Sequence, residues 1–257
     1  MKVHVLCFSP TGGTQKVADA LAKTLGEAGK ALDLTRRDAD FGAFSIAPGD
    51  VCVLAVPSFG GRVPAAALER LRAVRGNNAR AVLAVAYGNR AYDDTLMELR
   101  EAAKASGFRP VAAVAAVTEH SIIREYGAGR PDERDLAQLA TFGRQIAAAL
   151  ADGGALPEVA VPGKVPEKAP AALPMNPKAG RGCNRCGVCA SSCPVGAIPA
   201  QDPARTDGGR CISCMRCGAV CPQKARGLNP ALRLGAQQML KKACAEPKQN
   251  ELFLGRI

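Results

Sequence analysis

The chain has 257 residues, of which 47% are hydrophobic and 22% charged, a composition typical of globular proteins and unlike that of disordered chains. Its longest strictly apolar stretch, residues 111–117, is far shorter than the roughly 18 residues that cross a bilayer. The N-terminus lacks the long apolar region of a signal peptide. These features exclude a transmembrane helix and predict a cytoplasmic protein.

Residues 1–151 alternate strand and helix patterns and are expected to form the first domain. Because the strand patterns are apolar on both faces, they predict a parallel sheet covered on both sides by helices, a doubly wound α/β fold. Five runs have strand length: residues 2–8, 31–36, 51–57, 80–87 and 109–117. Four helical patterns separate or follow them: residues 14–28, 64–74, 92–106 and 132–151. We expect a loop at residues 37–50.

Residues 152–180 are rich in proline and show no sustained periodicity, which predicts a linker. Proline-rich segments favour extended conformations, so this linker either holds two modules apart or follows a surface. A cysteine-rich module is expected at residues 181–229, followed by a C-terminal helix and tail at residues 230–257. The predicted tail helix spans about residues 230–245.

The cysteines are concentrated in a duplicated motif. Residues 183–194 (CNRCGVCASSCP) recur 28 residues later as residues 211–222 (CISCMRCGAVCP), with every cysteine and the closing proline in register. Both copies fit C-x2-C-x2-C-x3-C-P, the run of two-cluster bacterial ferredoxins, in which the fourth cysteine ligates the other cluster. The motif predicts two [4Fe-4S] clusters, the first held by Cys183, Cys186, Cys189 and Cys221 and the second by Cys211, Cys214, Cys217 and Cys193.

Zinc and disulfide bonds are the alternative uses of these cysteines. Structural zinc uses paired C-x2-C knuckles and needs no third cysteine in the same knuckle. Disulfides are rare in a protein without an export signal, because the cytosol keeps thiols reduced. The other three cysteines, Cys7, Cys52 and Cys244, are expected to be buried thiols.

The positive charge of the chain is concentrated toward its cysteine-bearing end. The net charge is +11, of which residues 1–151 carry +3 and residues 152–257 carry +8. Each oxidised cluster would add about −2, which leaves the second part basic. This charge either belongs to a solvated surface or steers the protein toward an acidic redox partner. Nucleic acid is not an expected partner, because the basic residues neither cluster nor alternate with aromatic residues.

The first strand leads directly into a phosphate-binding pattern. Residues 9–14 (SPTGGT) place hydroxyl groups and backbone amides at the start of a predicted helix, where they can bind a phosphate without a cationic side chain. The loop has neither the Walker nor the dinucleotide-binding glycine pattern. It resembles the FMN phosphate loop of flavodoxins at Ser9, Thr11, Gly12, Gly13 and Thr14, although an ordinary capped helix start would look similar.

Two further loops are expected to complete an FMN site. In a flavodoxin-like five-stranded sheet of order 2-1-3-4-5, the ligand lies at the carboxyl ends of the strands near the switch point. We expect aromatic residues to stack on the flavin and amides to bind its pyrimidine edge, although the aromatics could equally cap surface loops. The candidate residues in these loops are Pro57, Ser58, Phe59, Gly60, Gly61, Tyr87, Gly88, Asn89, Arg90, Tyr92 and Asp93.

Taken together, these motifs resemble a bacterial family of flavodoxin/ferredoxin fusions, the EFR-type "ferrodoxin" proteins, over residues 2–227. The resemblance also rests on TEHSI (residues 118–122) and GRPDERDL (residues 129–136), which contain His120 and Arg130. It implies a flavodoxin-like FMN domain, a smaller α+β ferredoxin domain and a role in electron transfer. Arg62 and Arg90 stand where flavodoxins are acidic, and Trp is absent.

We therefore predict an electron-transfer flavoprotein that passes electrons between FMN, two [4Fe-4S] clusters and an external redox partner. The alternative is an enzyme whose flavin reduces a small molecule and is supplied with electrons by the clusters. A third class is a scaffold that has lost FMN and acts as a ferredoxin alone. A deep cavity with titratable groups over the flavin would favour the enzyme, and an exposed flavin edge would favour the carrier.

Overall fold

The computed structural model describes residues 1–151, 156–168 and 175–255. Its main sheet confirms the predicted order β2-β1-β3-β4-β5 with all five strands parallel. The three strands at residues 51–57, 80–87 and 109–117 are buried on both faces along nearly their whole length, which is why alternation of polar and apolar residues is absent from them. The strands are β1 (Lys2–Cys7), β2 (Glu27–Asp33), β3 (Val51–Pro57), β4 (Arg80–Tyr87) and β5 (Arg109–Val117).

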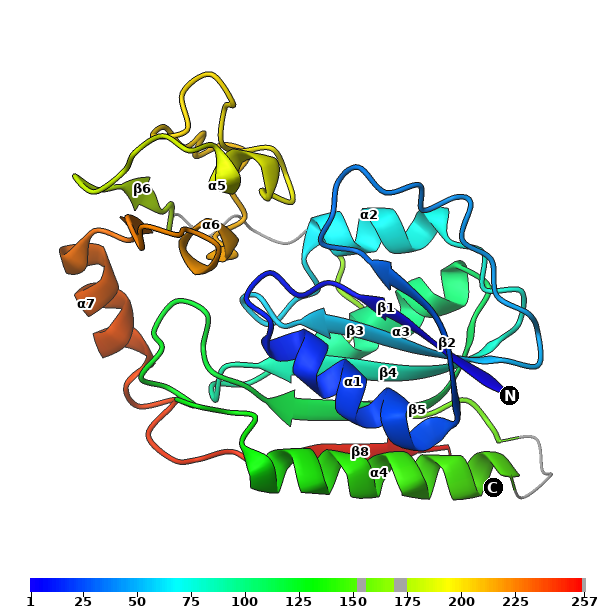
Figure 1. Cartoon of the computed structure of the whole chain (residues 1–257). Helices are drawn as coiled ribbons and strands as arrows, with labels where there is room; N and C mark the ends of the chain where they lie inside the picture. The colour runs from blue at the N-terminus through cyan, green and yellow to red at the C-terminus, as the bar shows by residue number, and fades with distance from the viewer. Residues whose placement is uncertain (152–155, 169–174, 256–257) are drawn as a thin grey trace.

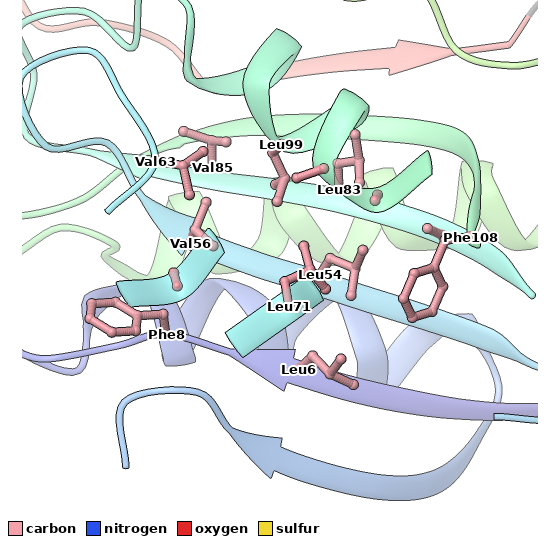
Figure 2. Close-up of a cluster of buried hydrophobic side chains, with 14 of the residues drawn as sticks. Leu6, Phe8, Leu54, Val56, Val63, Leu71, Leu83, Val85, Leu99 and Phe108 are labelled. Carbon is pink, nitrogen blue, oxygen red and sulfur yellow. The ribbon is translucent and has the colours of Figure 1, made fainter. Parts of the chain in front are cut away.

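Helices cover both faces of the sheet (Figure 1). On one face, α1 (Gly13–Leu25) and α4 (Glu133–Ala151) pack against each other and against the strands. On the other face, α2 (Ala65–Ala73) and α3 (Thr95–Ala105) cover the larger of the two hydrophobic clusters (Figure 2). This three-layer arrangement holds the carboxyl ends of the strands, and the loops that follow them, in a fixed position.

The second strand differs from its predicted position. It spans Glu27–Asp33, whereas the apolar pattern predicted residues 31–36, and the preceding helix ends at Leu25 rather than near residue 28. The reason is that β2 is an edge strand whose side chains are almost all exposed, so it carries no apolar pattern. The chain turns at Gly26 and enters the strand immediately.

The C-terminal tail adds a sixth strand that the sequence did not predict. After α7 (Pro230–Leu240), which ends earlier than predicted, the chain returns to the sheet as β8 (Glu251–Leu254), antiparallel to β5. This pairing covers the edge of β5 that would otherwise be free, and an uncovered edge strand is a site for unwanted pairing between chains. The tail is therefore part of the α/β domain in space.

Residues 156–168 of the proline-rich segment follow the surface of the α/β domain. Val159 is completely buried, and its backbone N–H donates to the carbonyl of Pro110 at 3.0 Å. Further along, the backbone N–H of Lys164 donates to Asp94 at 2.9 Å. Over these residues, the structure has the arrangement in which the segment lies along the domain, whereas Lys178–Ala179 pair within the cysteine module.

The cysteine module is a small α+β unit at the carboxyl-end side of the sheet (Figure 1). It contains a two-stranded sheet, β6 (Lys178–Ala179) and β7 (Arg226–Gly227), and two single-turn helices, α5 (Val188–Ser191) and α6 (Arg216–Ala219). Three pairs of residues with positive φ lie 28 positions apart, so the sequence repeat is also a backbone repeat: Arg185 and Ser213, Gly187 and Met215, Gly196 and Lys224. Within the described residues, no helix has the length and apolar character to cross a membrane.

Candidate functional site

A cavity that is open to solvent lies at the carboxyl ends of β1, β3, β4 and β5. It is bordered by the loops that follow these four strands. This position, beside the switch point between β1 and β3, is where open α/β sheets bind ligands. The predicted residues that line it are Thr11, Gly13, Thr14, Pro57, Ser58, Phe59, Gly60, Gly61, Tyr87, Gly88 and Arg90.

The loop after β1 presents the start of α1 to this cavity. Gly12 adopts a left-handed conformation, with φ of 92°, immediately before the helix, and the first turn of α1 carries no acidic residue. The hydroxyl of Ser9 accepts a hydrogen bond from the backbone N–H of Gln15 at 3.0 Å, so Ser9 shapes the loop without lining the cavity. The arrangement suits an anionic group, because unpaired amides and the helix dipole both favour negative charge.

The loops after β3 and β4 are held by side-chain contacts beneath them. The hydroxyls of Ser58 and Thr95 lie 2.8 Å apart, and Arg62 forms a bidentate ion pair with Glu98 at 2.6 and 3.0 Å. Arg62 is therefore neutralised under the loop and does not line the cavity. Arg90 does line it, and it is also paired with Asp93. The two arginines in these loops have different roles.

Five predicted residues do not line the cavity, although all lie beside it: Ser9, Gly12, Asn89, Tyr92 and Asp93. The ring of Tyr92 lies against that of Tyr87, with 5.2 Å between ring centroids, and its hydroxyl donates to Glu251. Asn89 is buried and donates to the carbonyls of Cys244 and Glu246, both at 3.1 Å. Both side chains therefore hold the C-terminal tail against the loop.

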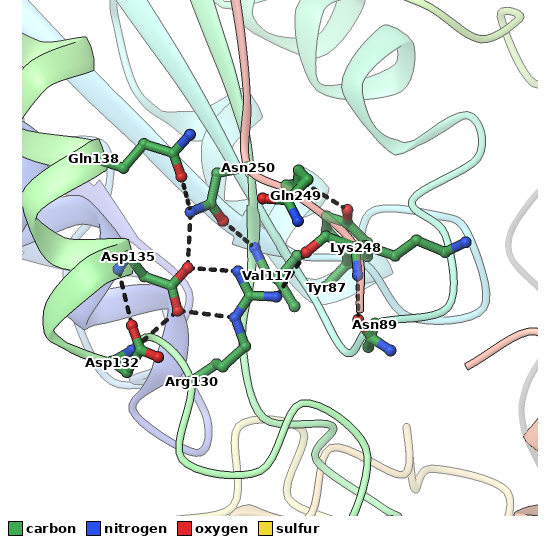
Figure 3. Close-up of polar contacts among 10 residues, drawn as sticks. All are labelled: Tyr87, Asn89, Val117, Arg130, Asp132, Asp135, Gln138, Lys248, Gln249 and Asn250. Atoms are coloured by element: carbon green, nitrogen blue, oxygen red, sulfur yellow. Dashed lines mark hydrogen bonds and ion pairs between the residues drawn. The ribbon is translucent and has the colours of Figure 1, made fainter. Parts of the chain in front are cut away.

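Polar contacts fix the tail to the end of β5 and the start of α4 (Figure 3). Arg130 pairs with Asp135 at the start of α4 and donates to the carbonyl of Lys248 at 2.7 Å. Asn250 accepts from the backbone N–H of Val117 and donates to Asp135. Burial would raise the pKa of Asp135, but the bonds from Arg130 and from backbone and amide donors lower it to about 2. Arg130 is thus a structural clamp.

The loop after β5 supplies cavity residues that the predicted site did not include: Thr118, Glu119, His120 and Ser121. Nδ1 of His120 accepts hydrogen bonds from the backbone N–H groups of Ile122 and Ile123 at 3.2 and 3.0 Å. Burial, helped by nearby Arg90, lowers the pKa of His120 to about 4. His120 is therefore neutral at pH 7. A Cβ added at Gly88 would lie 2.6 Å from the Cα of His120, so only glycine allows the two loops to approach this closely. The one signal in the sequence was the position of His120 at the carboxyl end of a strand.

The eight cysteines of the repeat border two cavities in the cysteine module. Cavity I is lined by Cys183, Cys186, Cys189 and Cys221, and cavity II by Cys193, Cys211, Cys214 and Cys217. Each cavity therefore takes three thiols from one copy of the motif and one from the other copy. The sets that meet in space are the sets that the spacing of the motif predicted.

The surroundings of these thiols suit a metal cluster. All eight are free thiols. In the described residues, no three His, Cys, Asp or Glu side chains converge as the ligands of a single metal ion do. The fourth cysteine of each copy accepts a backbone N–H bond at 3.3 Å, from Ala197 to Cys193 and from Ala225 to Cys221. Such bonds orient ligand sulfurs and tune a cluster.

The cysteine module contacts the α/β domain through the half that holds cavity II. Arg216, which lines cavity II, donates to the carbonyl of Pro10 at 3.3 Å, and Pro10 lines the α/β cavity. Arg70 of α2 donates to the carbonyl of Pro194, beside Cys193, while its guanidinium lies over the rings of Phe8 and Phe41. One arginine from each domain thus crosses the boundary, next to cavity II.

Comparison with known proteins gives one family match and several structural likenesses. Residues 182–225 match the model of the 4Fe-4S dicluster domain family. No curated protein sequence matches the chain. Among solved structures, an archaeal flavodoxin is 14% identical, with a TM-score of 0.43, and covers 59% of this chain and 99% of its own.

Two further solved structures resemble the same part of the chain. A flavodoxin from Streptococcus pneumoniae TIGR4 is 18% identical, with a TM-score of 0.42, over 58% of this chain and 99% of its own. Rubredoxin oxygen:oxidoreductase from Desulfovibrio gigas is 20% identical, with a TM-score of 0.44, over 58% of this chain and 36% of its own. In the present chain, the N-terminal domain is flavodoxin-like by the order and direction of its strands. The chain joins this domain to a 4Fe-4S module.

Proposed function

We propose that this chain, a flavodoxin-like domain followed by a 4Fe-4S module, is an electron-transfer flavoprotein that passes electrons between FMN, two [4Fe-4S] clusters and an external redox partner. The observation that carries the proposal is the contact between the two kinds of cavity: Arg216 lines a four-cysteine cavity and bonds to the wall of the α/β cavity. FMN exchanges one or two electrons and iron–sulfur clusters exchange one, so their combination suits the conversion between the two modes.

The α/β cavity fits FMN by the chemistry of its walls. The amides and hydroxyls at Thr11, Gly13 and Thr14 would bind the phosphate at the start of α1. Phe59 would lie against the ring system, and Arg90 would place a positive charge beside it. The predicted stacking role of Tyr92 is not part of the proposal, because that ring packs on Tyr87 and reaches the tail.

The two cysteine cavities would hold the clusters with crossed ligation. Cavity I takes its fourth thiol, Cys221, from the second motif, and cavity II takes Cys193 from the first. This crossing ties the two halves of the module together, so neither cluster can bind without ordering both motifs. The module has a small hydrophobic core, in which Cys189 and Cys193 are themselves members.

The two clusters would have different neighbours. The cluster in cavity II would be the inner one, because Arg216 and Arg70 hold that half against the α/β domain. The cluster in cavity I would be the outer one, because its ligand Cys186 and the neighbouring Arg185 are exposed. We therefore place the partner at cavity I and FMN beyond cavity II, with electrons passing through the clusters in between.

The partner that fits the outer cluster is an acidic redox protein. Three exposed basic residues lie within three positions of the ligands of cavity I: Arg181, Arg185 and Lys224. A basic surface around an exposed cluster accelerates the association with an acidic protein, and high salt reduces this association rate because it screens the attraction. Free thiols and iron–sulfur ligands fit the reducing cytoplasm that the sequence predicts.

The composition of the protein purified without oxygen tests this function. Two clusters and one flavin require about eight iron, about eight sulfide and one FMN per chain. Eight iron without flavin would instead make the protein a ferredoxin on a flavodoxin-like scaffold, and zinc in place of iron would overturn the redox function.

A further inference from the structure

The repeat in the cysteine module loses its symmetry at one buried position. Each motif is followed by four residues that end at Ile198 in the first copy and at Arg226 in the second, again 28 positions apart. Both side chains are buried, with 4% and 6% of their surface exposed. Ile198 lines cavity II, whereas Arg226 lines cavity I. One cluster site therefore has an apolar wall where the other has a permanent cation.

Arg226 has hydrogen-bond acceptors but no carboxylate partner. Its guanidinium donates to the carbonyls of Pro203 and Pro177 and to the hydroxyl of Thr206. None of the ion pairs within the described residues includes it, and its Nε is buried without a hydrogen-bond partner there. Neutral acceptors bind its two terminal nitrogens but leave its charge uncompensated, which is costly in a buried site.

The missing negative charge lies with the cysteines. Nη1 of Arg226 is 3.7 Å from Sγ of Cys189, a thiol of cavity I. The guanidinium thus lies against cavity I, with one of its nitrogens on a thiol of that cavity.

We propose that Arg226 is the fixed counter-charge of the outer cluster in cavity I and makes it the easier of the two clusters to reduce. The inference rests on the proposed function, because it needs clusters in both cavities. A cluster with four thiolates carries about −2 when oxidised and about −3 after it accepts one electron. A buried cation stabilises the more negative form more strongly, so it raises the reduction potential, and the effect decreases with distance. At the equivalent position, Ile198 gives the inner cluster no such stabilisation. Arg216, the cation that lines cavity II, is only half-buried, so solvent screens its charge more than that of Arg226.

The test is a redox titration of the full-length protein, followed by electron paramagnetic resonance, for the parent, Arg226→Met and Arg226→Lys. We expect Arg226→Met to lower the ratio of reduced to oxidised outer cluster at the parent's midpoint at least tenfold, which corresponds to 59 mV for one electron. The inner cluster should shift less, and Arg226→Lys should retain most of the parent's value. The matched control is Arg185→Met, an exposed arginine beside Cys186, which should shift either midpoint much less.

Unchanged midpoints in Arg226→Met, with both clusters bound, would overturn the inference. So would an equal shift in Arg226→Lys, because packing rather than charge would then be responsible. If Arg226→Met does not retain iron, the iron content of Arg226→Lys is measured instead. Iron bound by Arg226→Lys would support the need for a positive charge at this position, and its absence would contradict the inference. A parent protein without clusters would instead overturn the proposed function.

Discussion

The α/β cavity and the cysteine cavities are built in different ways. The walls of the α/β cavity come from four loops at the ends of a sheet with two large hydrophobic clusters, so the fold shapes it before any ligand binds. The cysteine module has only a small cluster of buried residues, and two of its five members are candidate ligands. We therefore expect FMN to bind a site that is already folded, whereas the cluster sites should fold only when the clusters bind.

Removal of iron is expected to produce the largest difference in stability between the two regions. Chelation under reducing conditions should unfold residues 181–229, because the cysteine module would lose its main source of stability, while the α/β domain remains folded. Hydrogen exchange measured by mass spectrometry would show full exchange in the module and protection in β3, β4 and β5. Continued protection of the module without iron would show that the cysteine module folds without its clusters and would contradict the difference between the two regions.

Single ligand changes should reveal the crossed construction. Cys193→Ser should damage the cluster whose other ligands belong to the second motif, and Cys221→Ser the cluster whose other ligands belong to the first, because each cavity borrows one thiol. Serine oxygen is a harder and poorer ligand for iron. Electron paramagnetic resonance after mild oxidation should show conversion to a three-iron form. The double variant Cys183→Ser, Cys193→Ser should damage both clusters, and one intact cluster would contradict crossed ligation.

Changes in the phosphate loop should affect FMN alone. Replacing Thr11 and Thr14 together by alanine should weaken FMN at least tenfold, because each charge-assisted hydroxyl bond contributes about 1 to 3 kcal/mol. Fluorescence titration of the flavin-free protein with FMN measures the effect. Thr141→Ala on the exposed side of α4 is the matched control and should bind FMN normally. Loss of iron in the double variant would show that the cavity and the module are not independently built.

Arg216 tests whether the contact between the regions has a function. Arg216→Ala removes its bonds to Ser192 and Pro10, each a charge-assisted bond across or beside the boundary. Losing about 1.5 kcal/mol of docking energy would slow electron exchange between flavin and clusters by up to about tenfold. Rapid-reaction spectroscopy would show the change, with exposed Arg210→Ala as the control. Equal rates in both variants would show that Arg216 does not couple the cavities.

The stability of the α/β domain should also depend on pH through His120. The folded-state pKa of His120, about 4, lies below its ordinary value of 6.5, so the unfolded chain binds the proton more readily. His120 therefore contributes stability that is present above pH 6.5 and lost as the pH falls to about 4, on the order of 1–3 kcal/mol. Urea unfolding of the flavin-free protein should become less pH-dependent in His120→Asn over this range. An unchanged pH profile would show that the imidazole is not responsible.

The sequence predicted the parts of the molecule whose signal is local. β3, β4 and β5 occupy their predicted ranges because buried parallel strands have continuous apolar runs. The two sets of cysteines could be predicted because the repeated motif itself contains the spacing of the cluster ligands. β2 was misplaced because an exposed edge strand has no apolar run, and β8 was missed because its four residues depend on the edge of β5.

The α/β cavity was predicted in part for the same reason. The glycine-rich loops after β1, β3 and β4 pointed to it, and most of their named residues line it. Asn89 and Tyr92 do not, because a tail more than 150 positions away occupies their hydrogen-bonding groups. No pattern within those loops reveals a partner so distant in the chain.

If flavin and clusters form one electron path within a single chain, the kinetics of their electron exchange should not depend on encounters between molecules. The protein is partly reduced without oxygen through its clusters by a rapid photochemical donor, and flavin absorbance is followed at several protein concentrations. The proposed path predicts a rate of flavin reduction that does not depend on protein concentration. A rate that rises in proportion to concentration would mean that electrons cross only between molecules, and it would contradict the path through Arg216.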